Sequence, residues 1–152
     1  MSGGAELAAS ARAIVDANLY MALGTADESG RPWVSPVYFA PLGYRDLLWV
    51  SRPERRHSQN LAVRDTVSIA IFDSTVPIGT GQGVYMTATA REVADDELEQ
   101  CIEVFSRRCV EHGGGPFGVA EARAPAPLRL YRASATEQWI LDSGDNRVPV
   151  TL

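Results

Sequence analysis

Every second residue is hydrophobic along two stretches of the chain, 66–72 and 84–93. A two-residue period is that of a strand with one buried face, so both stretches predict half-buried strands. The segment 73–83 between them contains Pro77 and several glycines, and it predicts a long hairpin connection. The buried positions are expected to be Val67, Ile69, Ile71, Val84, Met86, Ala88 and Ala90.

Shorter apolar runs predict five further strands. Polar turn residues separate the first two of these runs at 27–32, and 41–45 is expected to form another turn. Pro36 falls inside the second run, and because proline cannot donate to a ladder it marks an edge, a bulge or the rim of a barrel. The five runs are 19–26, 33–40, 47–50, 128–133 and 137–142.

Helical periodicity appears in two longer segments. Residues 5–18 predict an N-terminal helix, with Ser2 available near its start as a cap. A second helix is expected to open at Asp95 and Asp96 and to end in the glycine-rich segment 112–116. Its apolar stripe consists of Leu98, Cys101, Ile102, Phe105 and Cys109.

The two cysteines of the chain both lie in that second helix. Cys101 and Cys109 are expected about 12 Å apart along its axis, which is too far for a disulfide. Reduced, buried thiols fit a cytoplasmic protein. Residues 117–127 are expected to form a loop with one short helical turn.

Short connections between successive strands imply antiparallel pairing. Six or seven such strands with few helices predict a mainly β protein of the α+β kind, namely a closed or nearly closed antiparallel barrel with peripheral helices. With 152 residues and no linker or repeat, residues 1–152 are expected to form a single domain.

The composition excludes several classes of function. The net charge of −5 opposes binding to nucleic acid or to anionic lipid, and no apolar run has the length of a membrane span. We see no secretory signal, so the expected location is the cytoplasm. All 14 basic residues other than histidine are arginines, and without lysine the chain has no Schiff-base chemistry.

Against this acidic background, basic residues gather where the strand 47–50 ends. Ser51 closes the strand, and Pro53 stands where a short helix through Leu61 can begin. A helix N-terminus surrounded by guanidinium groups favours a bound phosphate, although a solvated helix face is the plainer reading. The cluster consists of Arg52, Arg55, Arg56 and His57.

Other chemistries have less support. His57 has no recognisable nucleophile and orienting partner for a hydrolase, and two histidines and two cysteines show no metal-ligand spacing, so no metal site is expected. The segment 79–83 matches no nucleotide-binding motif and reads as a turn. Four aromatic residues fit core packing, and one or two of them are candidates to border a flat cofactor: Tyr38, Trp49, Tyr85 and Trp139. An anion anchor without an acid–base pair suits chemistry carried by a bound cofactor.

Three ordered segments resemble the pyridoxamine 5′-phosphate oxidase-like family of FMN-binding split barrels. They are TADESGRPWVSPVYFA, LLWVSRPERRHSQNLAVRDTVSIAIFD and GVYMTATAREV, and YRASATEQWILD resembles the closing strands of the family. The resemblance implies a six-stranded antiparallel Greek-key split barrel that forms a homodimer, with a flavin in each of two interface clefts.

The resemblance also assigns candidate cofactor-binding residues. Arg56 and His57 match the phosphate pair of the family, and Arg52 would supply a further donor. Gln82 and Gly83, and with them Trp139, match positions that reach the flavin from the partner subunit. Val50 and Ser51 would face the cofactor, with Ser51 among the residues that hold the phosphate, and the strand of Ser35, Pro36 and Val37 would border the isoalloxazine ring.

Departures from the family pattern argue against authentic pyridoxamine-phosphate oxidase activity. Ser35 and Ala40 stand where the true oxidases carry an arginine and a lysine, and His57 replaces the usual lysine. The sequence therefore predicts an FMN-dependent oxidoreductase that transfers hydride to or from an unassigned small molecule. The alternatives are a reductase that uses the deazaflavin coenzyme F-420, a non-catalytic flavin- or haem-binding protein, and a barrel that has lost its ligand.

Overall fold

The computed structural model describes residues 3–152, so Ser2, the expected helix cap, lies outside the described residues. Its helices are α1 (Gly3–Ala17), α2 (Arg56–Val63), α3 (Asp95–Glu111) and the short 3-10 helix η1 (Val119–Ala122). Its strands are β1 (Tyr20–Ala26), β2 (Pro32–Tyr38), β3 (Ala40–Leu42), β4 (Asp46–Ser51), β5 (Thr66–Phe72), β6 (Gly83–Glu92), β7 (Arg129–Leu141) and β8 (Arg147–Pro149).

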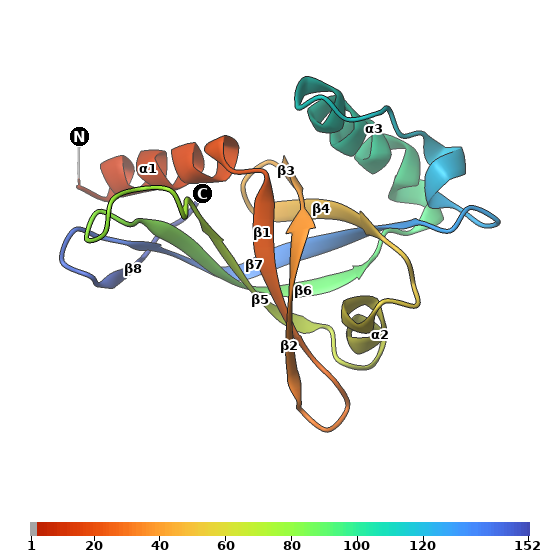
Figure 1. Ribbon diagram of the computed structural model, residues 1–152, viewed down its shortest axis with the longest axis horizontal. Coiled ribbons are helices and arrows are strands. Elements are labelled where there is room, and N and C mark those ends of the chain that lie inside the picture. The colour runs from red at the N-terminus through yellow and green to blue at the C-terminus, as the bar shows by residue number, and fades with distance from the viewer. Residues whose placement is uncertain (1–2) are drawn as a thin grey trace.

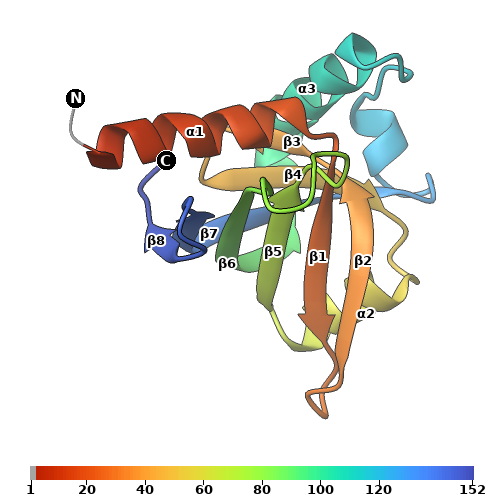
Figure 2. The same ribbon diagram turned by 60° about the vertical axis from the view of Figure 1, so that its left-hand side comes forward.

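All the strands belong to one antiparallel sheet that curls into an incomplete barrel (Figure 1). Its order is β2-β1-β5-β6-β7-β4-β3, and β8 is added beside β7. The alternating hydrophobic residues of β5 and β6 are buried in the core, as predicted: Val67, Ile69, Ile71, Val84, Met86, Ala88 and Ala90. Figure 2 shows α1 lying across one end of the curled sheet, where Ala11 and Val15 pack into the same core.

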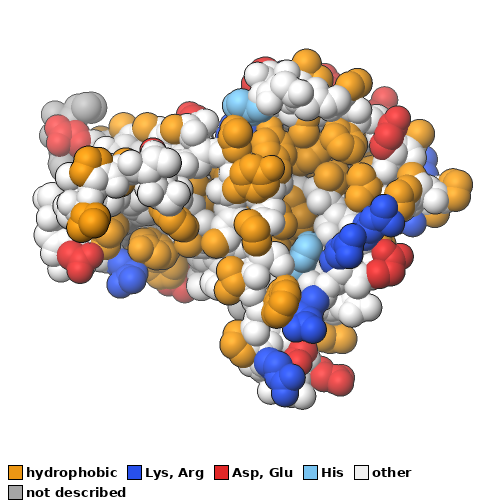
Figure 3. All heavy atoms as spheres, viewed as in Figure 1, with side chains coloured by type: hydrophobic (Ala, Val, Ile, Leu, Met, Phe, Trp, Pro, Cys, Tyr) orange, Lys and Arg blue, Asp and Glu red, His pale blue; other side chains and the backbone are white. Residues whose placement is uncertain are grey.

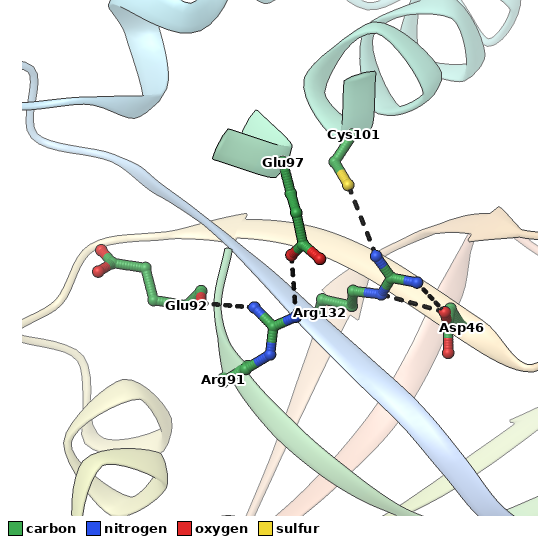
Figure 4. A network of polar contacts seen from close by, with 6 residues as sticks. All are labelled: Asp46, Arg91, Glu92, Glu97, Cys101 and Arg132. Atoms are coloured by element: carbon green, nitrogen blue, oxygen red, sulfur yellow. Dashed lines mark hydrogen bonds and ion pairs between the residues drawn. The ribbon is translucent and has the colours of Figure 1, made fainter. Parts of the chain in front are cut away.

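The second helical element, α3, covers β3 and β4 on the outside of the barrel. Every residue of its predicted stripe is buried, and both cysteines are free thiols. Polar contacts fix its orientation, because Arg132 of β7 pairs with Asp46 of β4 and contacts Cys101 of α3 (Figure 4). Beside them, Arg91 at the end of β6 pairs with Glu97 of α3 at 2.9 Å.

Three local predictions are wrong. The helix after β4 begins at Arg56 rather than at Pro53, because the chain first makes a turn in which Arg55 donates its N–H to the carbonyl of Arg52. Pro41 and Leu42 belong to β3 rather than to a turn.

The third concerns the end of the chain, where the two expected strands are one continuous strand, β7. A bulge opposite Thr87 and Ala88 accommodates the polar residues that separate the apolar runs of β7. Among residues 3–152, no helix combines the length and the hydropathy that crossing a bilayer requires.

Candidate functional site

A cavity of about 400 Å³ lies where the barrel is split, between the edge of β2 and the end of β4. We call it the split cavity. In the described sheet β2 pairs with β1 alone, so its other edge presents backbone N–H and C=O groups without ladder partners. Figure 3 shows hydrophobic side chains gathered on the face between α3 and β2, with basic side chains beside them. The cavity is lined by Pro36, Val37, Tyr38, Val50, Ser51, Arg55, His57, Phe105, Cys109 and Phe117.

The end of this cavity next to α2 is polar. Ser51 is buried, and its Oγ lies 2.9 Å from Nε2 of His57. Burial, and to a lesser extent the charge of Arg55, lowers the pKa of His57 below its ordinary value of 6.5, so the imidazole is neutral at neutral pH. Arg55, the N-cap residue of α2, makes no side-chain capping bond. The first N–H groups of α2 therefore remain available to an anion, together with Ser51 and Arg55.

Arg56 and His57 are neighbours in sequence, but their side chains lie in different spaces. The guanidinium of Arg56 stacks over the ring of Trp33, with its central carbon 4.1 Å from the ring centre. It lines a separate groove of about 270 Å³, together with Arg31 and Gln59. Both basic residues were expected at one phosphate, and the structure brings only His57 to the split cavity.

Two more of the predicted residues stand back from the split cavity. Ser35 accepts a hydrogen bond from Nε1 of Trp33 at 3.0 Å and is not among the lining residues, unlike Pro36 and Val37. Arg52 is exposed in the turn before α2 and lines neither this cavity nor the Arg56 groove.

The other end of the split cavity, under α3, is apolar. The ring of Tyr38 packs edge to face on Phe105, which packs in the same way on Phe117. The hydroxyl of Tyr38 lies 3.1 Å from Nδ1 of His112, just past α3. Burial raises the pKa of Tyr38 to about 12 and also raises the pKa of Cys109, so both groups keep their protons.

Sequence reasoning missed most of this apolar end. The α3 stripe predicts burial, and the period alone does not say which members of the stripe face a cavity. Tyr38 was a candidate only as an aromatic residue that could border a cofactor. The contact between β2 and the end of α3, which joins residues 74 positions apart, has no sequence signal.

Gln82, Gly83 and Trp139 lie away from the split cavity of their own chain. Gln82 and Gly83 line a third cavity, of about 580 Å³, between the β5–β6 connection and the β7–β8 turn. These segments are at the opposite side of the barrel from α2 (Figure 1). Trp139 is paired with Tyr85 of β6 and Pro149 of β8. Their assignment to a partner's site stays a prediction.

The residues of the split cavity fit a flavin mononucleotide. The free edge of β2 offers donors and acceptors to a ring system, and Pro36, Val37 and Val50 offer apolar walls. The phosphate has donors at the polar end in Ser51, Arg55 and the uncapped start of α2.

The family model described as "Pyridoxamine 5'-phosphate oxidase" matches residues 7–141 of this chain. No curated protein matches the sequence.

Solved structures share the fold at low sequence identity. The heme storage protein HutZ from Vibrio cholerae is 20% identical, with a TM-score of 0.70, over 88% of this chain and 94% of that one. A heme binding protein from Mycobacterium smegmatis is 18% identical, with a TM-score of 0.77, over 95% of this chain and 57% of that one. A structure described as an F420 reductase is 16% identical, with a TM-score of 0.58, over 80% of this chain and 89% of that one. These likenesses establish a split barrel.

Proposed function

The chain belongs to the pyridoxamine 5′-phosphate oxidase family, and from this premise we propose that it is a homodimeric FMN-dependent oxidoreductase acting on a small molecule. The observation that carries the proposal is the polar end of the split cavity. There the buried Ser51–His57 pair meets the uncapped start of α2 beside the free edge of β2.

The residues of the cavity divide the work of holding the cofactor. Arg55 donates to the phosphate. Ser51 also donates to it when neutral His57 carries its proton on Nε2 and donates to the Ser51 oxygen, because the hydroxyl has one proton to give. Arg56 joins them when it leaves the Trp33 ring. Backbone groups of Pro36 and Val37 face the isoalloxazine edge, and Ser35 positions this strand through Trp33. When bound, FMN supplies the hydride transfer that the side chains of this chain do not provide.

A second copy of the chain completes the site in this proposal. Gln82 and Gly83 sit beside a loop whose Ile78 is fully exposed, and Trp139 lies near the same end. Val76 of the same loop and Phe72, just before it, are also exposed, and several exposed apolar side chains close together support burial against a partner. The same copy would cover Val34 and Tyr20, which are also largely exposed.

The proposed activity is not that of a pyridoxamine-phosphate oxidase. Ser35 accepts a hydrogen bond from Trp33, and Ala40 is fully buried in β3. Neither position therefore offers the cationic group of the true oxidases.

Cofactor binding is tested by purifying the protein from a flavin-sufficient host and titrating it with FMN while flavin fluorescence is recorded. We expect a yellow protein that quenches one FMN per chain. Arg55→Gln should weaken binding at least tenfold, because a hydrogen bond to a charged group contributes about 1.5–3 kcal/mol. Arg107→Gln, on the exposed face of α3, is the matched control. A colourless protein that leaves FMN fluorescence unchanged contradicts the proposal.

A deazaflavin reductase is the second candidate, and one observation favours it. The Arg56 groove is separate from the split cavity, but Arg56 directly follows Arg55 in the chain, and the groove contains a second cation, Arg31, beside Asp27; two further guanidinium groups suit a longer acidic tail. Competition between FMN and coenzyme F-420 separates the two cofactors. Titration with haem belongs in the same experiment, since two of the structural neighbours are described as haem proteins. If haem displaces FMN and a Soret band of bound haem appears, non-catalytic haem binding is favoured.

A further inference from the structure

The apolar end of the split cavity is built from four side chains that the proposed phosphate contacts do not use. They are Tyr38, Phe105, Cys109 and Phe117, and we call them the Tyr38 wall. Three of them are aromatic rings packed edge to face, and the fourth is a thiol that burial keeps neutral. Such a surface favours contact with a flat apolar molecule.

The Tyr38 wall carries no counter-charge for an anion. Among the lining residues of the split cavity, Arg55 is the one fully charged side chain, and it stands at the polar end. The charge of Arg108 reaches Tyr38 and Cys109, where it partly offsets the effect of burial on their pKa values. Its guanidinium does not line the cavity, however, since it donates to the carbonyl of Asn18 at 2.8 Å and stacks over Phe39. A phosphate or carboxylate placed at this wall would lose its hydration and would face only a cation that is already engaged elsewhere.

One polar atom of the wall remains available to a ligand. The hydroxyl of Tyr38 is fixed at 3.1 Å from Nδ1 of His112. When that nitrogen carries the proton, it donates to Oη of Tyr38 and leaves the phenolic O–H free to donate. A carbonyl oxygen is the simplest neutral acceptor for this donor.

We propose that the Tyr38 wall binds the reaction partner of the flavin as a neutral, flat, aromatic molecule whose carbonyl oxygen accepts a hydrogen bond from Tyr38. The proposal rests on the proposed function, since it places this molecule beside a bound FMN. It assigns Tyr38 as a specificity-determining residue that selects neutral carbonyl compounds over phosphorylated or carboxylated ones.

The test compares three two-ring probes of nearly equal size by isothermal titration calorimetry: 2-acetylnaphthalene, 2-ethylnaphthalene and 2-naphthoate. With FMN-saturated protein, 2-acetylnaphthalene should bind at least tenfold more tightly than 2-naphthoate. Tyr38→Phe should weaken 2-acetylnaphthalene about three- to tenfold, the value of one neutral hydrogen bond, and leave 2-ethylnaphthalene unchanged. Tyr44→Phe is the matched control, because the Tyr44 hydroxyl donates to Asp16 at 2.9 Å and Tyr44 does not line the cavity.

A gain-of-function variant guards against a folding artefact. Phe117→Arg adds a cation to the partly exposed part of the wall. The variant should therefore bind 2-naphthoate more tightly, and the difference in affinity between 2-naphthoate and 2-acetylnaphthalene should become smaller. Equal binding of 2-naphthoate and 2-acetylnaphthalene to the wild type, no binding of 2-acetylnaphthalene, or an unchanged carbonyl preference in folded Tyr38→Phe would each overturn the proposal.

Measurements on FMN-free protein separate the two levels of the argument. A Tyr38-dependent preference for 2-acetylnaphthalene over 2-ethylnaphthalene, in a protein that fails to bind FMN, overturns the proposed function and supports the carbonyl site. If the protein binds FMN but shows no Tyr38-dependent preference for 2-acetylnaphthalene, the proposed function is supported and the carbonyl site is overturned.

Discussion

At the scale of single residues, the start of α2 shows that the direction in which a side chain points decides whether it lines the split cavity. Arg56 and His57 are consecutive, yet one stacks on Trp33 and the other meets Ser51 inside the split cavity. His57 is thereby desolvated next to a cation, Arg55, and both effects favour its neutral form. The split cavity is therefore arranged around a neutral hydrogen-bonding pair, and its positive charge comes from Arg55.

This environment predicts a pH dependence of stability that belongs to His57. The pKa of His57 is lowered in the folded state, so the unfolded chain binds a proton more readily as the pH falls through 6.5. Folding is then penalised at low pH, by less than about 1.4 kcal/mol per pH unit for one group. His57→Gln removes this penalty. As the pH falls from 7.5 to 5, the free energy of unfolding of the variant should therefore rise relative to that of the wild type.

Urea denaturation at several pH values measures the difference. A constant gap between His57→Gln and the wild type across this range would show that His57 titrates as it does in the unfolded chain.

At the scale of elements, a partly buried ion pair joins β7 to β4 beneath α3, which packs on the barrel through its apolar stripe. The side chains of Arg132 and Asp46 are 21% and 18% exposed, and the guanidinium of Arg132 also reaches Cys101 (Figure 4). Because α3 carries Phe105 and Cys109, its apolar packing on β4 and β7 sets the position of the Tyr38 wall.

Removing one partner of this pair should destabilise the protein. Arg132→Met leaves the carboxylate of Asp46 without its cation, and we expect a loss of about 2–4 kcal/mol in the free energy of unfolding. The double variant Arg132→Met/Asp46→Leu should recover most of the loss, since both charges are then absent. Arg107→Met breaks the exposed pair with Glu103 on the same helix and should cause no measurable change. Chemical denaturation checks all three variants, and equal losses in the single and double variants would contradict the argument.

The elements themselves were largely predictable because their signals are local. One face is buried in each of the strands 66–72 and 84–92 and in α3, and such one-sided burial requires hydrophobic residues at a regular spacing in the sequence. The break in β7 was misread because a bulge tolerates the polar residues that otherwise end a strand.

The site was less predictable, because its geometry depends on contacts between distant segments. The strand end at Ser51 and the basic residues after it were found from sequence. Which of them enters the cavity depends on where α2 begins, and the turn at Pro53 shifts that start to Arg56. The α3 residues of the wall looked like ordinary core, since a cavity and a core produce the same stripe.

At the scale of the whole molecule, the split of the barrel leaves two features at opposite ends. The split cavity lies between β2, β4, α2 and α3, while the loop 73–82 with its exposed Ile78 lies at the far side (Figure 1). A dimer in which the far side of one chain meets the split cavity of the other gives both features a partner. Because such a contact is repeated twice about a two-fold axis, it closes without forming a filament.

The loop tip is the most direct probe of this assembly. Ile78→Asp places a charge on a side chain that is fully exposed in the single chain, so it leaves the fold intact and should shift a dimer towards monomer. FMN affinity should fall with it if the loop completes the site. Val63→Asp, at an exposed position on α2, is the matched control for adding the same charge. Sedimentation equilibrium with parallel FMN titration checks both, and a monomeric wild type would contradict the assembly.

Mixing two defective chains tests whether a site is shared between subunits. Gln82→Ala should damage the site of the partner, whereas Ser51→Ala should damage the site of its own chain. In a heterodimer of the two, one site then receives both defects and the other receives none. Random exchange of equal amounts makes half of the dimers mixed, so about a quarter of all sites should regain wild-type FMN affinity. Fluorescence titration before and after subunit exchange measures that fraction. If each chain built its whole site alone, the mixture would bind FMN as the average of the two variants, and no tight fraction would appear.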